Sequence, residues 1–128
     1  EPYKIEGQDT KTFWGSNYLK PDIVIEKGVH TYIIDTKWKV PSSPSASIAD
    51  LRQMYAYNRF WDAKKVMLLY PGANKNTSYK SFETDEYHPN NEMDPFQHQC
   101  KLGFVDVVDA SGKLVSIAED IFQQLQFE

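Results

Sequence analysis

The stretch that decides the fold runs from Lys20 to Lys37 and reads KPDIVIEKGVHTYIIDTK. It contains two apolar runs, residues 23–25 and 32–34, which are rich in the β-branched and aromatic side chains that favour strands. Gly28 lies between them, at the first central position of a two-residue turn, where a type II′ hairpin turn requires glycine. The pattern therefore predicts an antiparallel hairpin with strands near residues 22–26 and 31–37.

The register of this hairpin brings charged residues together. Counting outward from Gly28 places Asp22 directly opposite Asp35, and a four-residue loop over residues 27–30 gives the same pairing. Opposed residues point to one face with Cβ atoms about 4.5–5.5 Å apart, and Lys37, two residues beyond Asp35, shares that face. Two adjacent carboxylates repel each other unless a cation lies between them. Oxygen ligands of this kind suit Mg²⁺ or Mn²⁺ better than zinc.

Motifs in and after this hairpin resemble a known nuclease family. Pro21-Asp22 followed by Asp35-Thr36-Lys37 resembles the motif of the PD-(D/E)XK nuclease superfamily. Together with residues 35–39, the segments 50–57 and 66–71 look like the C-terminal endonuclease domain of McrC, the nuclease subunit of the McrBC modified-cytosine restriction system. The resemblance is strong over residues 18–71 and weak outside them.

The resemblance implies a fold and a metal site. The fold is a restriction-endonuclease-like α/β/α sandwich around a mixed β-sheet, formed by residues 1–128 as a single nuclease domain. The metal is Mg²⁺, with Mn²⁺ as an alternative, and its ligands are Asp22, Asp35 and the backbone carbonyl of Thr36. The Thr36 side chain is expected to point to the opposite face.

The resemblance also implies roles for further polar residues. Lys37 would orient or deprotonate the attacking water and stabilise the developing charge. Gln53 and Tyr57 match the Gln-x-x-x-Tyr motif of RecB-like members, and four-residue spacing places them on one face of a helix. They could hold the water, the metal shell or the substrate backbone. Many members add an upstream acidic residue, for which Glu6 and Asp9 are both candidates.

The rest of the chain predicts further elements around the hairpin. Before the hairpin, we expect a strand and an irregular lead-in over residues 3–18. After it, we expect a loop over 41–47, a helix capped by Ser47 and running to about Asp62, and a buried strand over 66–70. A long polar segment over 72–98 is followed by a strand over 101–108, a turn over 109–112 and a last helix opened by Ser116 and Glu119. The first helix would connect two parallel strands by a right-handed crossover. These elements agree with a sandwich around a mixed sheet.

Composition and charge limit the function classes. The net charge of −4 argues against a bulk electrostatic DNA binder, but residues 37–65 contain six basic and two acidic residues, so a phosphate-facing surface could lie there. The single cysteine excludes an intramolecular disulfide and is consistent with a reducing cytoplasm. No apolar stretch reaches the roughly 18–20 residues of a membrane helix, and no signal peptide opens the chain. Because the chain begins Glu1-Pro2 without an initiator methionine, we expect an upstream domain in the same protein.

The leading functional hypothesis is an endonuclease that cleaves double-stranded DNA when assembled with an NTP-driven motor, a GTPase of the McrB type. The alternatives are a RecB-like exonuclease domain and a catalytically silent DNA-binding or assembly module on the same fold. The intact Asp22, Asp35 and Lys37 argue against the silent module. Base stacking by the aromatic residues at 38, 60 and 61 is less favoured than packing. Residues 72–98 could equally form a contacting flap or a disordered loop.

A zinc site is a further hypothesis for three residues near the end of the polar segment. His88, His98 and Cys100 are potential zinc ligands, but their spacing matches no standard pattern and a fourth ligand is missing. We therefore do not expect zinc.

Overall fold

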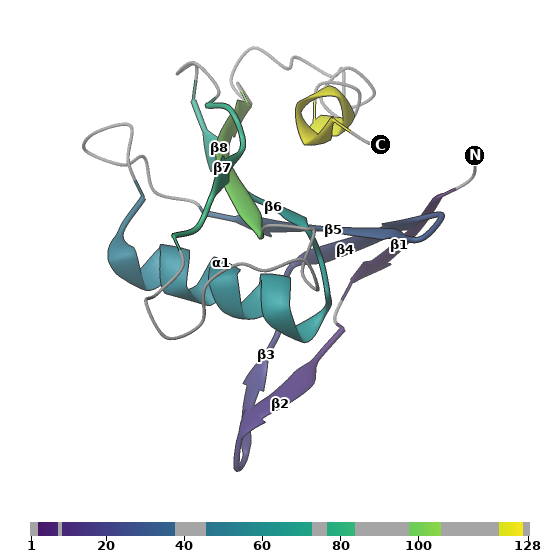
Figure 1. The fold of residues 1–128 in the computed structure, drawn as a ribbon, viewed down its shortest axis with the longest axis vertical. Helices are drawn as coiled ribbons and strands as arrows, with labels where there is room; N and C mark the ends of the chain where they lie inside the picture. The colour runs from purple at the N-terminus through teal and green to yellow at the C-terminus, as the bar shows by residue number, and fades with distance from the viewer. Residues whose placement is uncertain are drawn as a thin grey trace.

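A six-stranded mixed sheet forms the centre of the chain in the computed structural model (Figure 1). The structure describes residues 3–7, 9–37, 46–72, 77–83, 98–105 and 121–126. The elements are β1 (Tyr3–Gly7), β2 (Lys11–Trp14), β3 (Asn17–Leu19), β4 (Ile23–Lys27), β5 (His30–Thr36), α1 (Ile48–Phe60), β6 (Lys65–Pro71), β7 (Lys80–Ser81) and β8 (Gln99–Val105). The strand order is β1-β4-β5-β6-β8-β7, and β2 and β3 form a separate two-stranded sheet.

The β4–β5 hairpin has the predicted register. Its strands are antiparallel, and the pair Ile23–Ile34 places Asp22, one residue before β4, opposite Asp35. Gly28 has a φ of +64°, the sign that the first central position of a type II′ turn requires. The local turn chemistry therefore fixes which residues meet at the far end of the hairpin.

The connection from β5 through α1 to β6 joins two parallel strands, as predicted. Ser47 caps the helix, because its Oγ accepts a hydrogen bond of 3.0 Å from the backbone N–H of Asp50. At the other end, the Trp61 N–H donates to the Tyr57 carbonyl, and Asp62 leaves the helix with a φ of +50°. β6 then pairs in parallel with β8, so the centre of the sheet is parallel and its edges are antiparallel.

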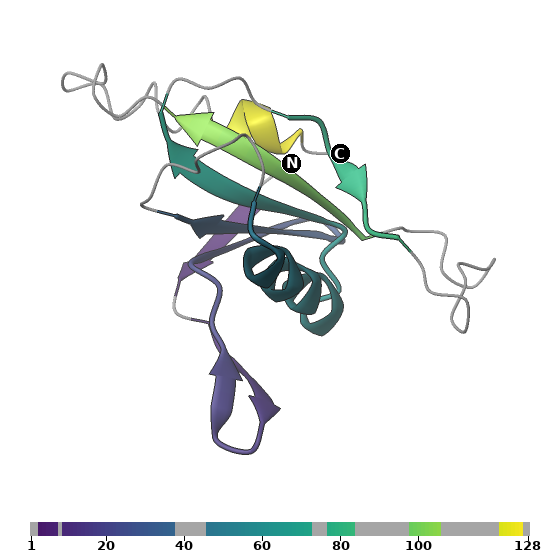
Figure 2. The ribbon, with the colours of Figure 1, turned by 90° about the vertical axis from the view of Figure 1, so that its left-hand side faces the viewer.

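Both faces of the sheet are covered, which confirms the predicted sandwich. Figure 2 shows α1 on one face and helical residues 121–125 on the other. The core on the α1 side consists of Val24, Ile33, Met54, Tyr57, Trp61, Ala63, Val66, Leu68, Tyr70, Cys100 and Phe104. The core on the opposite side consists of Ile25, Tyr32, Ile34, Met67, Leu69, Val105 and Leu125. Side chains alternate along a strand, so Asp35, two residues after Ile33, faces α1.

Other predicted elements need correction. The irregular lead-in before β4 is wrong, because β1 adds to the sheet beside β4 and residues 11–19 form the β2–β3 hairpin. The polar segment 72–98 contains the short edge strand β7, and β8 begins at Gln99 rather than at residue 101. The predicted turn and the capping box of the last helix lie outside the described residues. In the described part of the chain, no helix is long and apolar enough to cross a membrane.

Candidate active site

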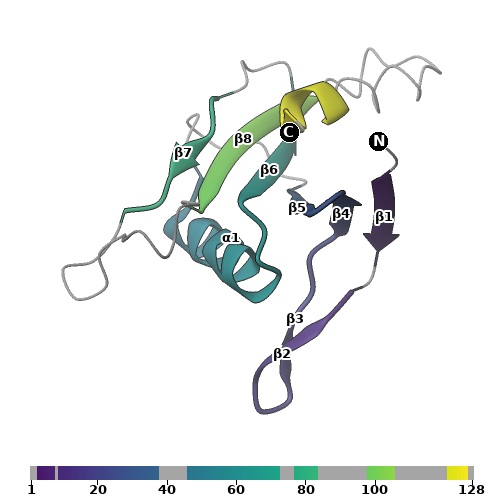
Figure 3. The ribbon, with the colours of Figure 1, turned by 45° about the vertical axis from the view of Figure 1, so that its right-hand side comes forward.

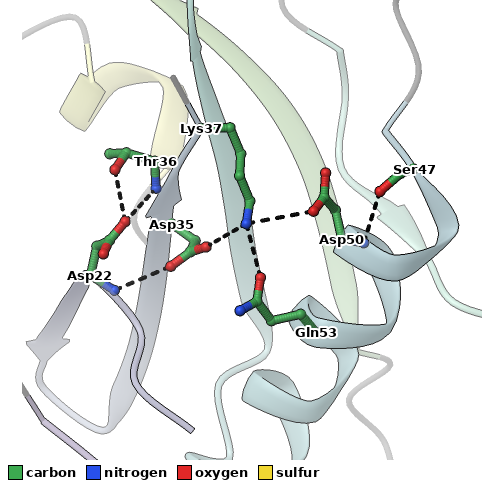
Figure 4. Close-up of polar contacts among 7 residues, drawn as sticks. All are labelled: Asp22, Asp35, Thr36, Lys37, Ser47, Asp50 and Gln53. Carbon is green, nitrogen blue, oxygen red and sulfur yellow. Dashed lines mark hydrogen bonds and ion pairs between the residues drawn. The ribbon is translucent and has the colours of Figure 1, made fainter. Parts of the chain in front are cut away.

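The Lys37 amine lies at the centre of the candidate site, between the end of β5 and the first turns of α1 (Figure 4). Its Nζ is 3.0 Å from Asp35 Oδ2 and donates a hydrogen bond of 2.9 Å to Gln53 Oε1. A third oxygen, Asp50 Oδ1, is 3.6 Å away. The backbone N–H of Lys37 donates to the Leu69 carbonyl at 2.8 Å, which holds Lys37 beside β6. One ammonium group is therefore surrounded by two carboxylates and an amide oxygen.

Asp22 lies next to this cluster, but its carboxylate is bound by Thr36. The Asp22 backbone N–H donates to Asp35 Oδ1 at 3.3 Å, whereas Asp22 Oδ2 accepts hydrogen bonds from the Thr36 N–H at 2.8 Å and the Thr36 Oγ1 at 2.7 Å. The expectation that the Thr36 side chain points away is wrong for its hydroxyl. The exposed Asp22 carboxylate lies across the end of β5, because the Thr36 N–H and hydroxyl both donate hydrogen bonds to it there.

The electrostatics of the cluster follow from burial and from an excess of carboxylates. Burial raises the pKa of Asp35, whose side chain is only 7% exposed, although its contacts with Lys37 oppose this shift. Burial by itself lowers the pKa of Lys37, but the ion pairs with Asp35 and Asp50 outweigh it, so the net shift of the Lys37 pKa is upward. Lys37 is therefore held as an ammonium ion. Asp22, Asp35 and Asp50 against one lysine leave net negative charge, an arrangement that attracts a cation.

Gln53 contacts Lys37 directly, whereas Tyr57 lies in the core. Tyr57 is 1% exposed, and its ring packs edge-on against Trp61 at a centroid distance of 5.8 Å. Burial raises the pKa of the Tyr57 phenol, and the charges of Asp35 and Asp22 raise it further. Tyr57 is therefore a neutral hydroxyl group close to the two aspartates.

Asp50, in the first turn of α1, is a site residue to which no sequence motif assigned a role. Residues 50, 53 and 57 follow a helical i, i+3, i+7 spacing, which places their side chains on one face. Because Gln53 and Tyr57 were already assigned to that face, this spacing was the signal that could have identified Asp50.

The two candidate upstream acids have other partners. Glu6 in β1 forms an ion pair of 3.0 Å with Lys4. Asp9 accepts a hydrogen bond of 2.7 Å from the Trp61 indole N–H. These contacts assign Asp9 to the attachment of the β2–β3 hairpin.

The zinc hypothesis gains no support from the residues that the structure describes. The His98 ring packs edge-on against Tyr55 at 6.0 Å, and burial raises the pKa of the Cys100 thiol to about 12. His88 lies outside the described residues.

The prediction that aromatic side chains pack rather than stack on bases can be checked at Trp61. Trp61 is buried in the core, which confirms the preference for packing over base stacking at that position. Trp38 lies outside the described residues.

The donor set fits a hard divalent cation that keeps part of its water shell. In the described part of the chain, no three His, Cys, Asp or Glu side chains form a group that could hold a metal ion. Asp22 and Asp35 provide two carboxylates at one strand end, and the Thr36 peptide carbonyl is the remaining candidate oxygen donor. Mg²⁺ is typically bound by one or two carboxylates together with several waters.

Comparison with known proteins shows the family of this chain. The model of the family described as McrBC 5-methylcytosine restriction system component matches residues 1–71. The chain belongs to this family. No curated protein matches the chain.

One solved structure has a similar fold. It is the refined half-complex from a tetradecameric assembly of Thermococcus gammatolerans McrB AAA+ hexamers with bound McrC. The likeness has a TM-score of 0.60 at 18% sequence identity and covers 94% of this chain. The chain spans 29% of the length of the matched chain.

Proposed function

We propose that this chain is the DNA-cleaving domain of an McrBC-type restriction system, a Mg²⁺-dependent endonuclease of the PD-(D/E)XK type that hydrolyses phosphodiester bonds in double-stranded DNA. The observation that carries the proposal is the Lys37 amine, held 3.0 Å from the buried Asp35 carboxylate at the end of β5 in a chain of this family. A carboxylate and a lysine at this spacing provide a cation ligand and a positive group for one phosphate.

Each site residue has a distinct task in this proposal. Asp22 and Asp35, with the Thr36 carbonyl, would hold Mg²⁺, which when bound supplies polarisation of the phosphate and a lower pKa for a bound water. Lys37 would donate hydrogen bonds to the developing oxyanion, because its raised pKa favours this role over that of a base. Gln53 and Asp50 would position Lys37, and Tyr57 would support that helix face from the core.

We also propose that the domain acts in the cytoplasm with partners. The chain has a net charge of −4, so its own attraction for a duplex is weak. The solved structure with the similar fold contains McrC bound to McrB hexamers. A GTPase motor of the McrB type and an upstream domain of the same protein would therefore bring DNA to the site.

Reconstituted cleavage tests the proposal. The protein is combined with an McrB-type motor, GTP and Mg²⁺, and closed circular DNA containing 5-methylcytosine is the substrate. The wild-type complex should linearise the circle, Asp35→Ala and Lys37→Ala should not, and the exposed control Lys80→Ala should cut like the wild type. Cleavage of linear DNA alone would indicate an exonuclease. Binding without any cutting by the wild-type complex would indicate a silent module.

A further inference from the structure

The β2–β3 hairpin projects away from the six-stranded sheet (Figure 3). Within the residues that the structure describes, it pairs with no strand of that sheet, and all four residues of β2 are exposed. Trp14 and Tyr18, near its turn, are 76% and 63% exposed. Trp14 is paired with Asn17, the residue before Tyr18, so the two rings extend from opposite faces of the hairpin. Large aromatic side chains exposed on one projecting hairpin mark an interaction surface.

The base of the hairpin is attached to the C-terminal end of α1. Asp9 accepts the 2.7 Å hydrogen bond from Trp61, and the Lys11 amine lies 5.2 Å from the centre of the same indole ring. The Phe13 ring packs against Phe60 at a centroid distance of 5.4 Å. Because α1 also carries Asp50 and Gln53, these contacts orient the hairpin relative to the candidate site.

Charge complementarity favours a polyanion as the partner of this surface. Residues 10–20 contain two lysines and three aromatic residues but no acidic residue, whereas the whole chain has a net charge of −4. Lys20 is exposed, and Asp22 of the candidate site follows it by two residues. Lys20 therefore presents an ammonium group two residues from Asp22, and the rings of Trp14 and Tyr18 lie farther out along the hairpin.

A groove extends the same surface along the outer side of α1. It has a volume of about 610 Å³, and Phe13 of the hairpin and Phe60 of the helix both line it. Arg52 and Arg59 also line it, and within the described residues neither arginine makes an ion pair. Glu83 is the acidic residue in this lining. Aromatic rings combined with arginine suit unpaired bases, which stack on aromatic side chains while cations follow the backbone.

We propose that the β2–β3 hairpin grips DNA beside the scissile phosphate, with Trp14 and Tyr18 stacking on unpaired bases and Lys20 neutralising a backbone phosphate. The position beside the scissile phosphate rests on the proposed nuclease function, whereas the DNA contact itself does not. A closed duplex hides the faces of its bases, so the hairpin binds forked or opened DNA better than a blunt duplex.

Fluorescence anisotropy with the 128-residue chain tests this contact. The probes are labelled forked, single-stranded and blunt duplex DNA, measured in EDTA at low salt so that no cleavage occurs. Trp14→Ala and Tyr18→Ala should each weaken binding to the forked probe about five-fold or more. Lys20→Ala should reduce the slope of log K against log salt by about one. Val29→Ala, a change at a 94% exposed residue on the β4–β5 turn, is the matched control and should bind like the wild type.

The outcomes separate this inference from the proposed function. Hairpin variants that bind forked DNA like the wild type would overturn it. The inference would also be overturned if the hairpin variants bound DNA normally but no longer pulled down an McrB-type motor, because the hairpin would then be a protein-binding surface. A third outcome is that the hairpin variants bind DNA more weakly than the wild type, while the wild-type complex does not cut DNA. This result would support the hairpin contact and refute the nuclease proposal.

Discussion

Replacing Lys37 with methionine should destabilise the fold, and the loss should depend on pH. The Lys37 ammonium is 3.0 Å from Asp35 and 3.6 Å from Asp50 and donates to Gln53. Methionine keeps most of the side-chain length but removes the charge and the donor. Within the described residues, Asp35 has no other ion-pair partner, so its carboxylate, only 7% exposed, would lose its compensating charge.

The size of the effect follows from the exposure of the pair. Removing one partner of a fully buried ion pair costs about 3–5 kcal/mol. Because the side chain of Lys37 is 18% exposed and that of Asp50 is 17% exposed, water reaches part of the cluster. We therefore expect a loss of about 2 kcal/mol in the free energy of unfolding, which lowers the Tm by about 5–10 °C in a domain of this size.

The pH dependence has a definite sign. Burial already raises the pKa of Asp35, and loss of Lys37 should raise it further. A carboxyl group with a raised pKa in the folded state contributes stability below its unfolded pKa, and this contribution is lost as the pH rises through the folded value. The deficit of Lys37→Met should thus be small near pH 4 and complete at neutral pH, and Mg²⁺ should reduce it if the carboxylates bind the ion.

Thermal melts between about pH 4 and about pH 8, with and without Mg²⁺, measure this effect. Lys80→Met is the control, because Lys80 is an exposed lysine on the edge strand β7. Equal melting temperatures for Lys37→Met and Lys80→Met across the whole pH range would refute the electrostatic account of the site.

Three further predictions concern cleavage. Asp35→Ala should abolish cutting by the reconstituted complex, and full activity with Mg²⁺ would contradict the assigned role. Its metal-free melting temperature should be unchanged or slightly higher, because burial of the Asp35 carboxylate is itself unfavourable and Lys37 keeps Asp50 and Gln53 as partners, whereas Lys37→Met leaves Asp35 without an ion-pair partner. Thr36→Val removes the hydroxyl that binds Asp22 but keeps the backbone N–H, so thermal melts should show a loss of about 0.5–1.5 kcal/mol in the free energy of unfolding. The rate of single-turnover cleavage should fall less than with Asp35→Ala. The chain alone with Mg²⁺ should cut plain DNA poorly and gain activity from an McrB-type motor with GTP, which a time course on gels would reveal; efficient cutting without the motor would exclude the dependence on partners.

The elements that sequence patterns predicted are those fixed by local interactions. Gly28 determines the hairpin register, which brings Asp22 opposite Asp35, and Ser47 determines where α1 begins. The alternation of side chains along the strand predicted that Lys37 shares a face with Asp35, and the two side chains form an ion pair of 3.0 Å. In each case the deciding contacts lie within a few residues of the signal.

The features that were missed depend on tertiary contacts or on exposed side chains. All residues of β2 are exposed, so no alternation of apolar and polar residues marks the β2–β3 hairpin. The contact between Asp50 and Lys37 depends on how α1 is rotated over the sheet. The carboxylate of Asp22 is exposed, so several rotamers are sterically allowed. The hydrogen bonds from the Thr36 N–H and hydroxyl stabilise the rotamer that is observed.

The strand order has a consequence for how the chain folds. The β4–β5 hairpin closes over a two-residue turn, whereas the parallel pairing of β6 with β8 must join residues as distant in sequence as Lys65 and Gln99. Short loops close at a lower entropic cost and faster than long ones, so the hairpin that carries Asp35 can form while the other half of the sheet is still unpaired. Asp35 would then enter the transition state for folding as a solvated carboxylate. Its desolvation, completed only when α1 docks, should appear in the unfolding rate rather than in the folding rate.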